Sequence, residues 1–264
     1  MNDKTKYEIM KNRELLKGYN GKDAGAEKTD QEQKLPSLPS LQEKKGTETI
    51  PLPTDYENLP LSGNLMELIR ERTSRRAYTE EPLSLLELSF LLWAAQGVRH
   101  FAGHKNPVTF RNVPSAGSRH TFETYLFVNR VEGLKKAVYH YLPENHALEI
   151  WEDRADFDDE LTDALCGQRF AALAPVFFVW ASVPYRMEWR YGLKAEKYIL
   201  IDAGHVCENL YLACEAIGCG TCAIGAYDQD RIDELLGFAP GPSAEKDYTC
   251  VVYGAPVGKK KNQA

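Results

Sequence analysis

The stretch Lys194–Gly225 reads KAEKYILIDAGHVCENLYLACEAIGCGTCAIG, and the order of its features decides the fold class. Its first part, Lys194–Ile217, has apolar side chains at helical spacing and predicts the longest helix of the chain. Gly218 and Gly220 end that helix, and a strand is predicted over Ala223–Ala226. A dinucleotide-binding fingerprint has the opposite order, because its glycines follow a strand and open a helix. We therefore exclude a doubly wound nucleotide-binding fold.

This predicted helix carries more apolar surface than a single core-facing stripe requires. A surface helix of a monomer usually has one apolar stripe, with polar residues on its opposite face. Here the apolar side chains are spread more widely, at Tyr198, Ile199, Ile201, Val206, Leu210, Tyr211 and Leu212. We therefore expect the helix to pack against a second copy of the chain as well as against its own core.

A second buried helix is predicted earlier in the chain. Ser84 and Glu87 have the spacing of a capping box, and Leu88–Ala95 is apolar nearly all round. The other predicted elements are a helix over Leu65–Arg72, a loop over Arg99–Gly117, strands over Glu123–Val131, Ala137–Tyr141, Leu148–Trp151, Ala174–Ala181 and Tyr248–Gly254, and helices over Asp156–Gln168 and Asp228–Leu236. Helices followed by a meander of strands and then by alternating strands and helices are typical of an α+β sandwich.

The N-terminal residues 1–57 differ in composition from the rest. They are polar and punctuated by prolines, and apart from a short helix near Tyr7–Leu16 they cannot bury a core of their own. They form either a disordered arm or a strap across the folded body. We expect the folded domain to cover residues 58–264.

Composition and charge restrict the function. The chain has 264 residues, 43% of them hydrophobic and 27% charged, which is ordinary for one large globular domain. A net charge of −6 argues against broad nucleic-acid binding. Apolar runs such as Ala174–Ser182 are too short to span a bilayer, and the start at Met1–Lys6 lacks the apolar stretch of a secretory signal. We expect a cytoplasmic protein without membrane spans.

Cys219 and Cys222 form a CxxC motif that has two familiar functional interpretations. A zinc site would need a second ligand pair at suitable spacing, which the sequence lacks. A thioredoxin-like site would need a helix that opens at the first cysteine, whereas here a helix closes. We therefore predict no metal, and we interpret these thiols as small core residues.

Two segments are candidates for binding a ligand. In the segment Arg72–Arg76, alternate residues of an extended chain place Arg72, Ser74 and Arg76 on one side, where they can bind a phosphate dianion. The alternative is a solvated basic turn. The segment Pro114–His120 combines small residues with hydroxyls, which allows close approach and hydrogen bonding to a flat ligand.

Taken in order, the segments resemble the nitroreductase-like FMN oxidoreductases. The resemblance covers about Ser62 to the C-terminus and rests on Arg72–Tyr78, Pro114–Gly117, Asp202–His205, Asn209–Leu210, Gly218–Gly225 and Val251–Pro256. The Asp-Ala-Gly-His run and the Pro114–His120 segment are most similar to the streptolysin-type dehydrogenases, which oxidise azoline rings in modified peptides. The resemblance implies a three-layer sandwich with a mixed sheet flanked by helices, and an intertwined homodimer with FMN at the subunit interface.

The resemblance also implies roles for particular residues. Arg72, Thr73, Ser74 and Arg76 would form the phosphate segment, completed by Lys259 or Lys261. Pro114, Ser115, Ala116, Gly117 and Ser118 would lie against the isoalloxazine ring. Ala223, Ile224 and Gly225 would pass along its edge, with the amides of Ile224 and Gly225 near N5 and O4.

The implied activity is electron transfer between NAD(P)H and a small organic acceptor. Two alternatives remain: an azoline dehydrogenase, and a flavin-binding carrier without turnover. The azoline branch has a Lys-Tyr pair before the Ala-Gly-His helix, and this chain has Arg190-Tyr191 there. Arg190 is a poor proton acceptor because its pKa is too high, so of this candidate catalytic pair we expect Tyr191 to affect turnover.

Overall fold

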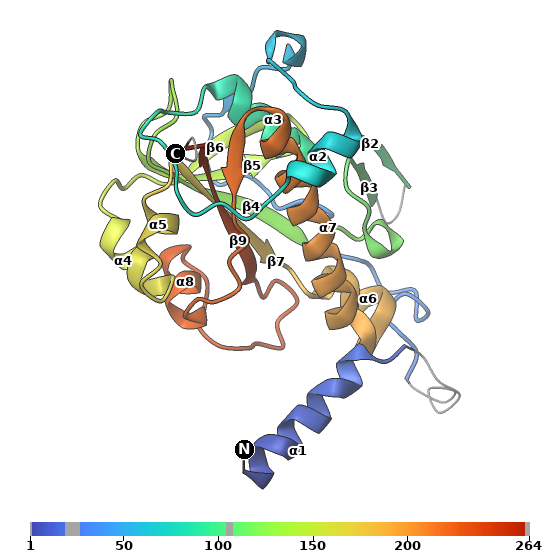
Figure 1. Ribbon diagram of the computed structural model, residues 1–264. Coiled ribbons are helices and arrows are strands. Elements are labelled where there is room, and N and C mark those ends of the chain that lie inside the picture. Colours follow the sequence, from blue (N-terminus) through green and yellow to red (C-terminus); the bar gives the residue numbers. More distant parts are fainter. Residues whose placement is uncertain (1, 19–26, 104–107, 262–264) are drawn as a thin grey trace.

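The computed structural model describes residues 2–18, 27–103 and 108–261. A seven-stranded sheet forms its centre, with the strand order β1-β6-β5-β4-β7-β9-β8 (Figure 1). Its strands are β1 (Ile50–Pro51), β4 (Phe122–Val128), β5 (Ala137–Leu142), β6 (Ala147–Glu152), β7 (Val176–Ser182), β8 (Cys219–Thr221) and β9 (Cys250–Lys259). All the ladders of this sheet are antiparallel, whereas the resemblance implied a mixed sheet. In the described part of the chain, parallel pairing is confined to the isolated bridges Ser74–Thr221 and Leu83–Val131.

Helices cover both faces of the sheet. One face packs against α3 (Leu85–Gln96) and α7 (Ala195–Ala216), and the other against α4 (Asp158–Ala164), α5 (Arg169–Ala172) and α8 (Gln229–Leu235) (Figure 1). Two separate apolar cores result, one on each side of the sheet. The α+β class and the three-layer arrangement are therefore confirmed.

The central strands are apolar on both faces because both faces are covered. In β7, Phe178 and Trp180 lie in the core beneath α3 and α7, whereas Phe177 and Val179 lie in the opposite core. Side chains of a strand alternate between the two faces of its sheet. A strand buried on both faces has no polar-apolar alternation, and its continuous apolar run was enough to predict it correctly.

The predicted capping box is present at the start of α3. The Ser84 hydroxyl accepts a hydrogen bond from the Glu87 amide at 3.2 Å, and the Ser84 amide donates to the Glu87 carboxylate at 2.8 Å. Two of the orphan donors at the start of the helix are thereby satisfied. The helix runs to Gln96 and is buried along most of its length, as its apolar composition predicts.

Several elements differ from the prediction. The expected loop over Arg99–Gly117 contains a two-stranded hairpin, β2 (Val98–Ala102) with β3 (Val108–Arg111). The helix expected over Asp156–Gln168 is shorter, since α4 ends at Ala164 before Cys166 and Gly167 adopt positive φ angles, and α5 begins only at Arg169. The strand expected over Ala223–Ala226 lies earlier, at β8, where it pairs with the end of β9.

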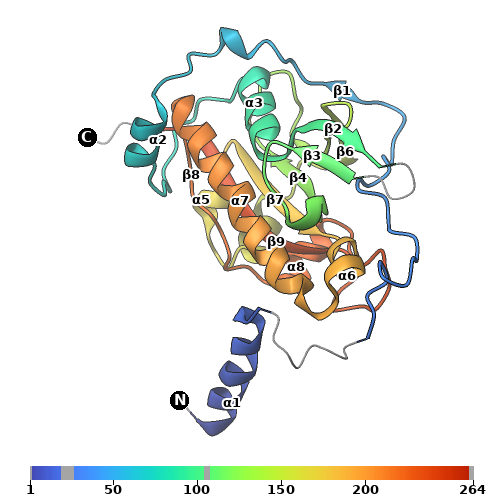
Figure 2. The same ribbon diagram turned by 90° about the vertical axis from the view of Figure 1, so that its right-hand side faces the viewer.

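The remaining helices lie at the edges of the body. α2 (Leu65–Glu71) precedes the candidate phosphate segment, and α6 (Tyr185–Tyr191) is a helix that was not predicted. α1 (Asp3–Asn12) stands away from the body (Figures 1 and 2). Short 3-10 turns are η1 (Arg13–Leu16), η3 (Tyr56–Asn58), η4 (Ala116–Ser118) and η5 (Gly192–Lys194).

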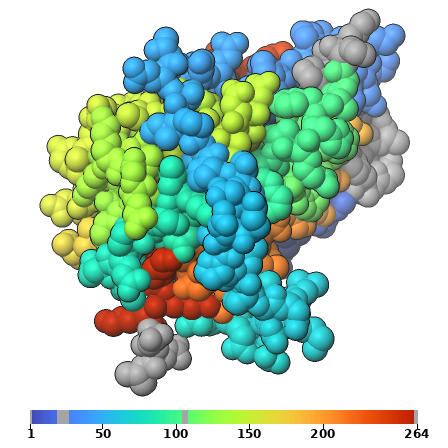
Figure 3. Space-filling model, turned by 90° about the horizontal axis from the view of Figure 1, so that it is seen from above, coloured from blue at the N-terminus to red at the C-terminus, as the bar shows by residue number. Residues whose placement is uncertain are grey.

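After α1, residues 27–57 of the N-terminal segment lie along the body (Figures 2 and 3). Its backbone amides hydrogen-bond to buried carboxylates: Gln42 donates to Glu123 at 2.8 Å, and Lys45 and Gly46 donate to Glu149 at 2.8 and 3.0 Å. We call residues 40–46 the strap. The boundary between residues 57 and 58 stays a prediction.

None of the helices in the described ranges has the length and apolar character that a membrane crossing requires.

Candidate functional site

The candidate phosphate segment is extended and lies beside α7. α2 ends at Arg72, and Ser74 forms a parallel bridge with Thr221 at the edge of the sheet. The Ser74 hydroxyl lies 2.9 Å from the Tyr211 hydroxyl, and the Arg72 guanidinium lies 5.2 Å from the centre of the Tyr211 ring. Arg72 and Ser74 therefore meet at one side chain of α7. Ser74 is otherwise exposed, as are Thr73 and Arg76.

Tyr211 joins this segment to the glycine-rich loop. Besides contacting Ser74, its hydroxyl accepts a hydrogen bond from the Ala223 amide at 2.8 Å. Burial raises the pKa of Tyr211, so the phenol stays protonated at neutral pH. From its place in the helical pattern, Tyr211 was expected only to be part of the apolar helix surface. Its buried hydroxyl was the signal that a polar partner had to be near.

The glycine-rich loop offers fewer free amides than expected. The Ile224 amide donates to the Gly254 carbonyl at 2.7 Å, and the Ile224 side chain is in the core. The Ala223 amide is bound to Tyr211. Gly225 is exposed, and its amide donates to no described residue. Of the expected ring-edge donors, Gly225 is therefore the one that can face a ligand.

Gly220 fixes the contact between this loop and the phosphate segment. A Cβ atom at Gly220 would lie 2.7 Å from Cδ of Arg75. The Arg75 amide also donates to the Thr221 carbonyl at 2.9 Å. The alternation that places Arg72, Ser74 and Arg76 on one side would turn Arg75 away from the site, but the stem of Arg75 packs against the loop backbone.

Asp202 of α7 holds the segment Pro114–Ser118 in place. The Asp202 carboxylate accepts a hydrogen bond from the Ala116 amide at 3.2 Å and another from the Ser115 hydroxyl. Ser115 in turn accepts from the His120 amide at 2.9 Å. The Ser115 hydroxyl thus shapes the loop rather than projecting from it. Burial of the Asp202 carboxylate raises its pKa.

Gly117 brings the candidate catalytic pair against this loop. Its φ is +56°, in the left-handed region that favours glycine. A Cβ atom there would lie 2.7 Å from the Tyr191 hydroxyl and 3.0 Å from Nε of Arg190. The structure therefore brings Arg190 and Tyr191 next to the loop, although α6 itself was not predicted.

Two of the three C-terminal lysines are engaged in ion pairs. Lys259 pairs with Glu87 of α3, and Lys260 pairs with Glu215 of α7. Lys261 is exposed and pairs with no carboxylate in the described part of the chain. Of the two lysines proposed for a phosphate, Lys261 is therefore the one with a free charge.

The two candidate loops are anchored on opposite sides of α7. Asp202 holds the Pro114–Ser118 loop, and Tyr211 holds the phosphate segment. Nine residues of helix amount to about two and a half turns and about 13 Å along the axis. The two anchoring side chains therefore leave α7 in opposite directions, and the two loops face different sides of one chain.

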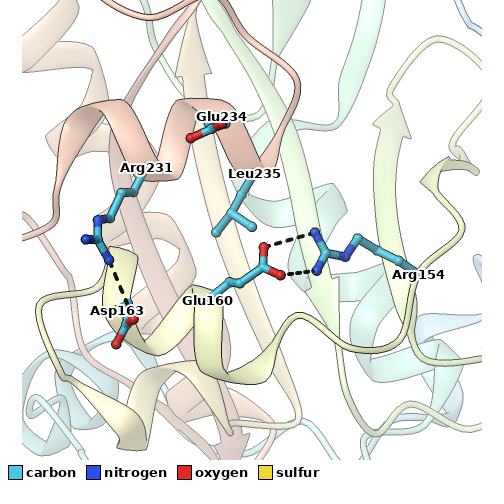
Figure 4. A pocket seen from close by; sticks show the side chains of 6 residues that line it. All are labelled: Arg154, Glu160, Asp163, Arg231, Glu234 and Leu235. Carbon is cyan, nitrogen blue, oxygen red and sulfur yellow. Dashed lines mark hydrogen bonds and ion pairs between the residues drawn. The ribbon is translucent and has the colours of Figure 1, made fainter.

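Two cavities are lined by candidate residues. One, of about 310 Å³, is lined in part by Pro114, Ser115 and Ser118. The other, of about 570 Å³, lies over Tyr191. A third cavity, of about 540 Å³, lies between α4 and α8, where Arg154 and Arg231 form ion pairs with Glu160 and Asp163 (Figure 4). Both of its arginines are paired with carboxylates and it is lined by none of the candidate residues, so we assign it no role.

The CxxC cysteines lie inside the protein. Cys219 and Cys222 are both buried, and burial raises the pKa of the Cys219 thiol to about 12. Such a thiol stays protonated at neutral pH and is a poor nucleophile. Within the described ranges, no group of three or more His, Cys, Asp or Glu side chains is arranged to hold a metal ion.

Comparisons with known proteins identify a family. The model of the "Nitroreductase family" matches residues 69–258. A relative from Methanocaldococcus jannaschii, "Putative nitroreductase MJ1384", is 35% identical over 214 residues, which cover 81% of this chain and 98% of the relative.

Solved structures extend the comparison to the fold. A "putative nitroreductase" from Anabaena variabilis is 25% identical, with a TM-score of 0.59 over 74% of this chain and 38% of that one. The Escherichia coli microcin synthetase complex with truncated pro-microcin B17 contains a chain that is 16% identical, with a TM-score of 0.56 over 99% of this chain and 95% of its own length. This second likeness is one of fold.

Proposed function

The chain belongs to the nitroreductase family, and on this premise we propose that it binds FMN and passes electrons between NAD(P)H and a small organic acceptor. The observation that carries the proposal is the meeting at Tyr211 of the segment Arg72–Arg76 and the glycine-rich loop. Bound FMN would supply the electron-transfer chemistry, and the protein would supply position and electrostatic field.

The residues at Tyr211 fit a phosphate group. Arg72 is half-buried and forms no ion pair with a described residue, so its charge is available. A phosphate dianion needs charge-assisted partners when it is removed from water. Arg72, Ser74, Arg76 and Lys261 can provide them, with Thr73 exposed beside them. Lys259 is a weaker candidate because it is paired with Glu87.

The loop Pro114–Ser118 fits the face of a flat ring. Its residues are small, and Asp202 fixes its backbone. Tyr191 lies against Gly117 of this loop, so the Tyr191 hydroxyl can hold a proton close to the flavin ring. The exposed amide of Gly225 can donate a hydrogen bond to the ring edge.

A second copy of the chain is required if one FMN is to contact both loops. The phosphate segment and the Pro114–Ser118 loop are held on opposite sides of α7. Pairing two chains through α7 would bring the phosphate segment of one copy to the Pro114–Ser118 loop of its partner. α7 also exposes two large apolar side chains, Leu200 at 59% and Ile201 at 44%, which such a contact would cover.

We expect the flavin-bound protein to be a dimer with twice the 29.8-kDa chain mass. Light scattering at micromolar concentration measures this directly. The double substitution Leu200→Glu and Ile201→Glu places charges in the apolar contact and should yield a monomer that loses its flavin. Ile150→Glu, at an exposed position of β6, is the matched control and should stay dimeric. A wild-type monomer that retains flavin contradicts the arrangement.

Tyr191→Phe removes the hydroxyl beside Gly117 and keeps the ring. Because a positioned acid or base accelerates proton transfer, we expect kcat to fall by about tenfold or more, with little change in the unfolding midpoint. Stopped-flow rates and the flavin spectrum measure the effect. Tyr198→Phe is the control, since the Tyr198 ring lies 4.6 Å from that of Tyr191. Unchanged rates and an unchanged spectrum in Tyr191→Phe would remove Tyr191 from the site.

The absorbance spectrum of the purified protein tests the main proposal. Flavin bands from a cofactor that is released on denaturation and identified as FMN are the expected result. Steady oxidation of NADH or NADPH by this holoprotein would exclude a carrier without turnover. A colourless protein that takes up no added FMN overturns the proposal. The cytoplasmic location expected from the sequence stays a prediction.

A further inference from the structure

The cavity of about 310 Å³ lies between the base of the β2–β3 hairpin and the Pro114–Ser118 loop. Arg99 and Arg111 line it from the hairpin, and Ser115, Ser118 and His120 line it from the loop. No carboxylate is among its lining residues in the described part of the chain. In a protein of net charge −6, this combination is a local positive region.

Part of the lining is already engaged and forms rigid walls. The Arg111 guanidinium donates to the Gln96 side chain at 2.7 Å and to the carbonyls of Phe122 and Ser40 at 3.2 and 3.3 Å. Glu123 also balances part of its charge. Ser115 is bound to Asp202 and to the His120 amide. These groups keep the shape of the cavity when it is empty.

Three other polar side chains lining the cavity have no partner in the described part of the chain. Arg99 is exposed and forms neither an ion pair nor a hydrogen bond there. The Ser118 hydroxyl and the His120 imidazole likewise form no hydrogen bond with a described residue. Burial, together with the nearby charges of Arg111 and Arg119, lowers the pKa of His120 to about 2. At neutral pH its neutral ring therefore offers one N–H donor.

We propose that this cavity binds an anionic oxygen group, a carboxylate or a phosphate, of the molecule that exchanges electrons with the bound flavin. Arg99 supplies the charge, and Ser118 and His120 supply neutral donors. The inference rests on the proposed function, because Ser115 and Ser118 belong both to the cavity and to the loop assigned to the flavin ring. A volume near the lower limit of ligand pockets suits one end of a molecule rather than a whole dinucleotide.

Calorimetric titration of the holoprotein with benzoate and with inorganic phosphate tests the site without turnover. Both probes should bind the wild type. Arg99→Gln should weaken binding by about ten- to hundredfold, the worth of one hydrogen bond between charged groups. Arg99 is exposed, so folding should be unaffected. Arg169→Gln, which removes an exposed arginine from α5 on the opposite face of the sheet, is the control.

Kinetics distinguish the two sources of the anion. If it is the acceptor's carboxylate, Arg99→Gln lowers the ratio of kcat/KM for 4-nitrobenzoate to that for the neutral 4-nitrobenzamide. If it is a phosphate of the donor, the substitution raises KM for NADPH or NADH instead.

The binding and flavin measurements separate the two proposals. Absence of probe binding in a flavin-loaded protein, or equal binding by Arg99→Gln and Arg169→Gln, overturns the site and leaves the proposed function intact. Binding at Arg99 by a protein that takes up no FMN keeps the anion site and overturns the proposed function.

Discussion

Arg72→Ala is expected to weaken FMN binding by about ten- to hundredfold. FMN carries a phosphate with close to two negative charges at neutral pH, and Arg72 is a half-buried cation beside the Ser74 and Tyr211 hydroxyls. A hydrogen bond between charged groups contributes about 1.5–3 kcal/mol, which corresponds to this loss of affinity. Flavin fluorescence during titration of the apoprotein measures the dissociation constant.

Riboflavin provides the comparison that assigns the effect to the phosphate. It lacks that group, so it should bind the wild type poorly and respond little to Arg72→Ala. Arg70→Ala is the matched control, because Arg70 lies two residues earlier, is 67% exposed and pairs with Glu71 in solvent. Arg75 cannot serve as this control, since its stem packs against Gly220. Equal losses for riboflavin and FMN would show that Arg72 supports the fold or the ring instead.

Arg186→Met is expected to lower the free energy of unfolding by about 3–5 kcal/mol. Arg186 lies 2.6 Å from Glu123, and their side chains are only 4% and 2% exposed. Removing one partner of a buried pair leaves an uncompensated charge, which is costly. Urea denaturation of the apoprotein measures the change. Adding Glu123→Gln to Arg186→Met should recover part of the loss, and a change below about 1 kcal/mol would contradict the assignment.

The pH dependence of stability identifies the same pair. Burial alone would raise the pKa of Glu123, but Arg186 and the hydrogen bond from His140 outweigh it and lower the pKa to about 2. This pKa lies below the ordinary value of 4.5. The ionised Glu123 carboxylate therefore contributes to the free energy of unfolding above pH 4.5, and this contribution is lost as the pH falls towards 2. In Arg186→Met, the decrease in the free energy of unfolding on acidification should be smaller than in the wild type. His140, whose pKa the two glutamates raise despite burial, contributes in the opposite sense and loses its contribution as the pH rises.

The elements that local sequence determines were predicted well. The capping box at Ser84 and Glu87 and the apolar run of β7 specify their conformations from a few neighbouring residues. β8 was misplaced because its position depends on pairing between Cys219 and Lys259, forty residues later in the chain. α6 was missed because Pro184 and a mixture of aromatic and charged residues show no clear helical periodicity.

The candidate site likewise has a part that the sequence could predict and a part that it could not. The segments that contact a ligand could be found because their side chains have recognisable chemistry. The residues that position them could not, since Tyr211 and Asp202 have partners more than eighty residues away. Ile224 shows the converse error. Its amide could be proposed as a donor only while its partner Gly254 was unknown.

The strap has a consequence for the order of events during synthesis. Gln42 is made 81 residues before Glu123, and Lys45 is made 104 residues before Glu149. At ribosomal rates of about 5–20 residues per second, the strap emerges about 5–20 seconds before its second carboxylate exists. Its amides stay in water during that interval. The strap therefore becomes anchored late, after the strands that carry Glu123 and Glu149 have left the ribosome.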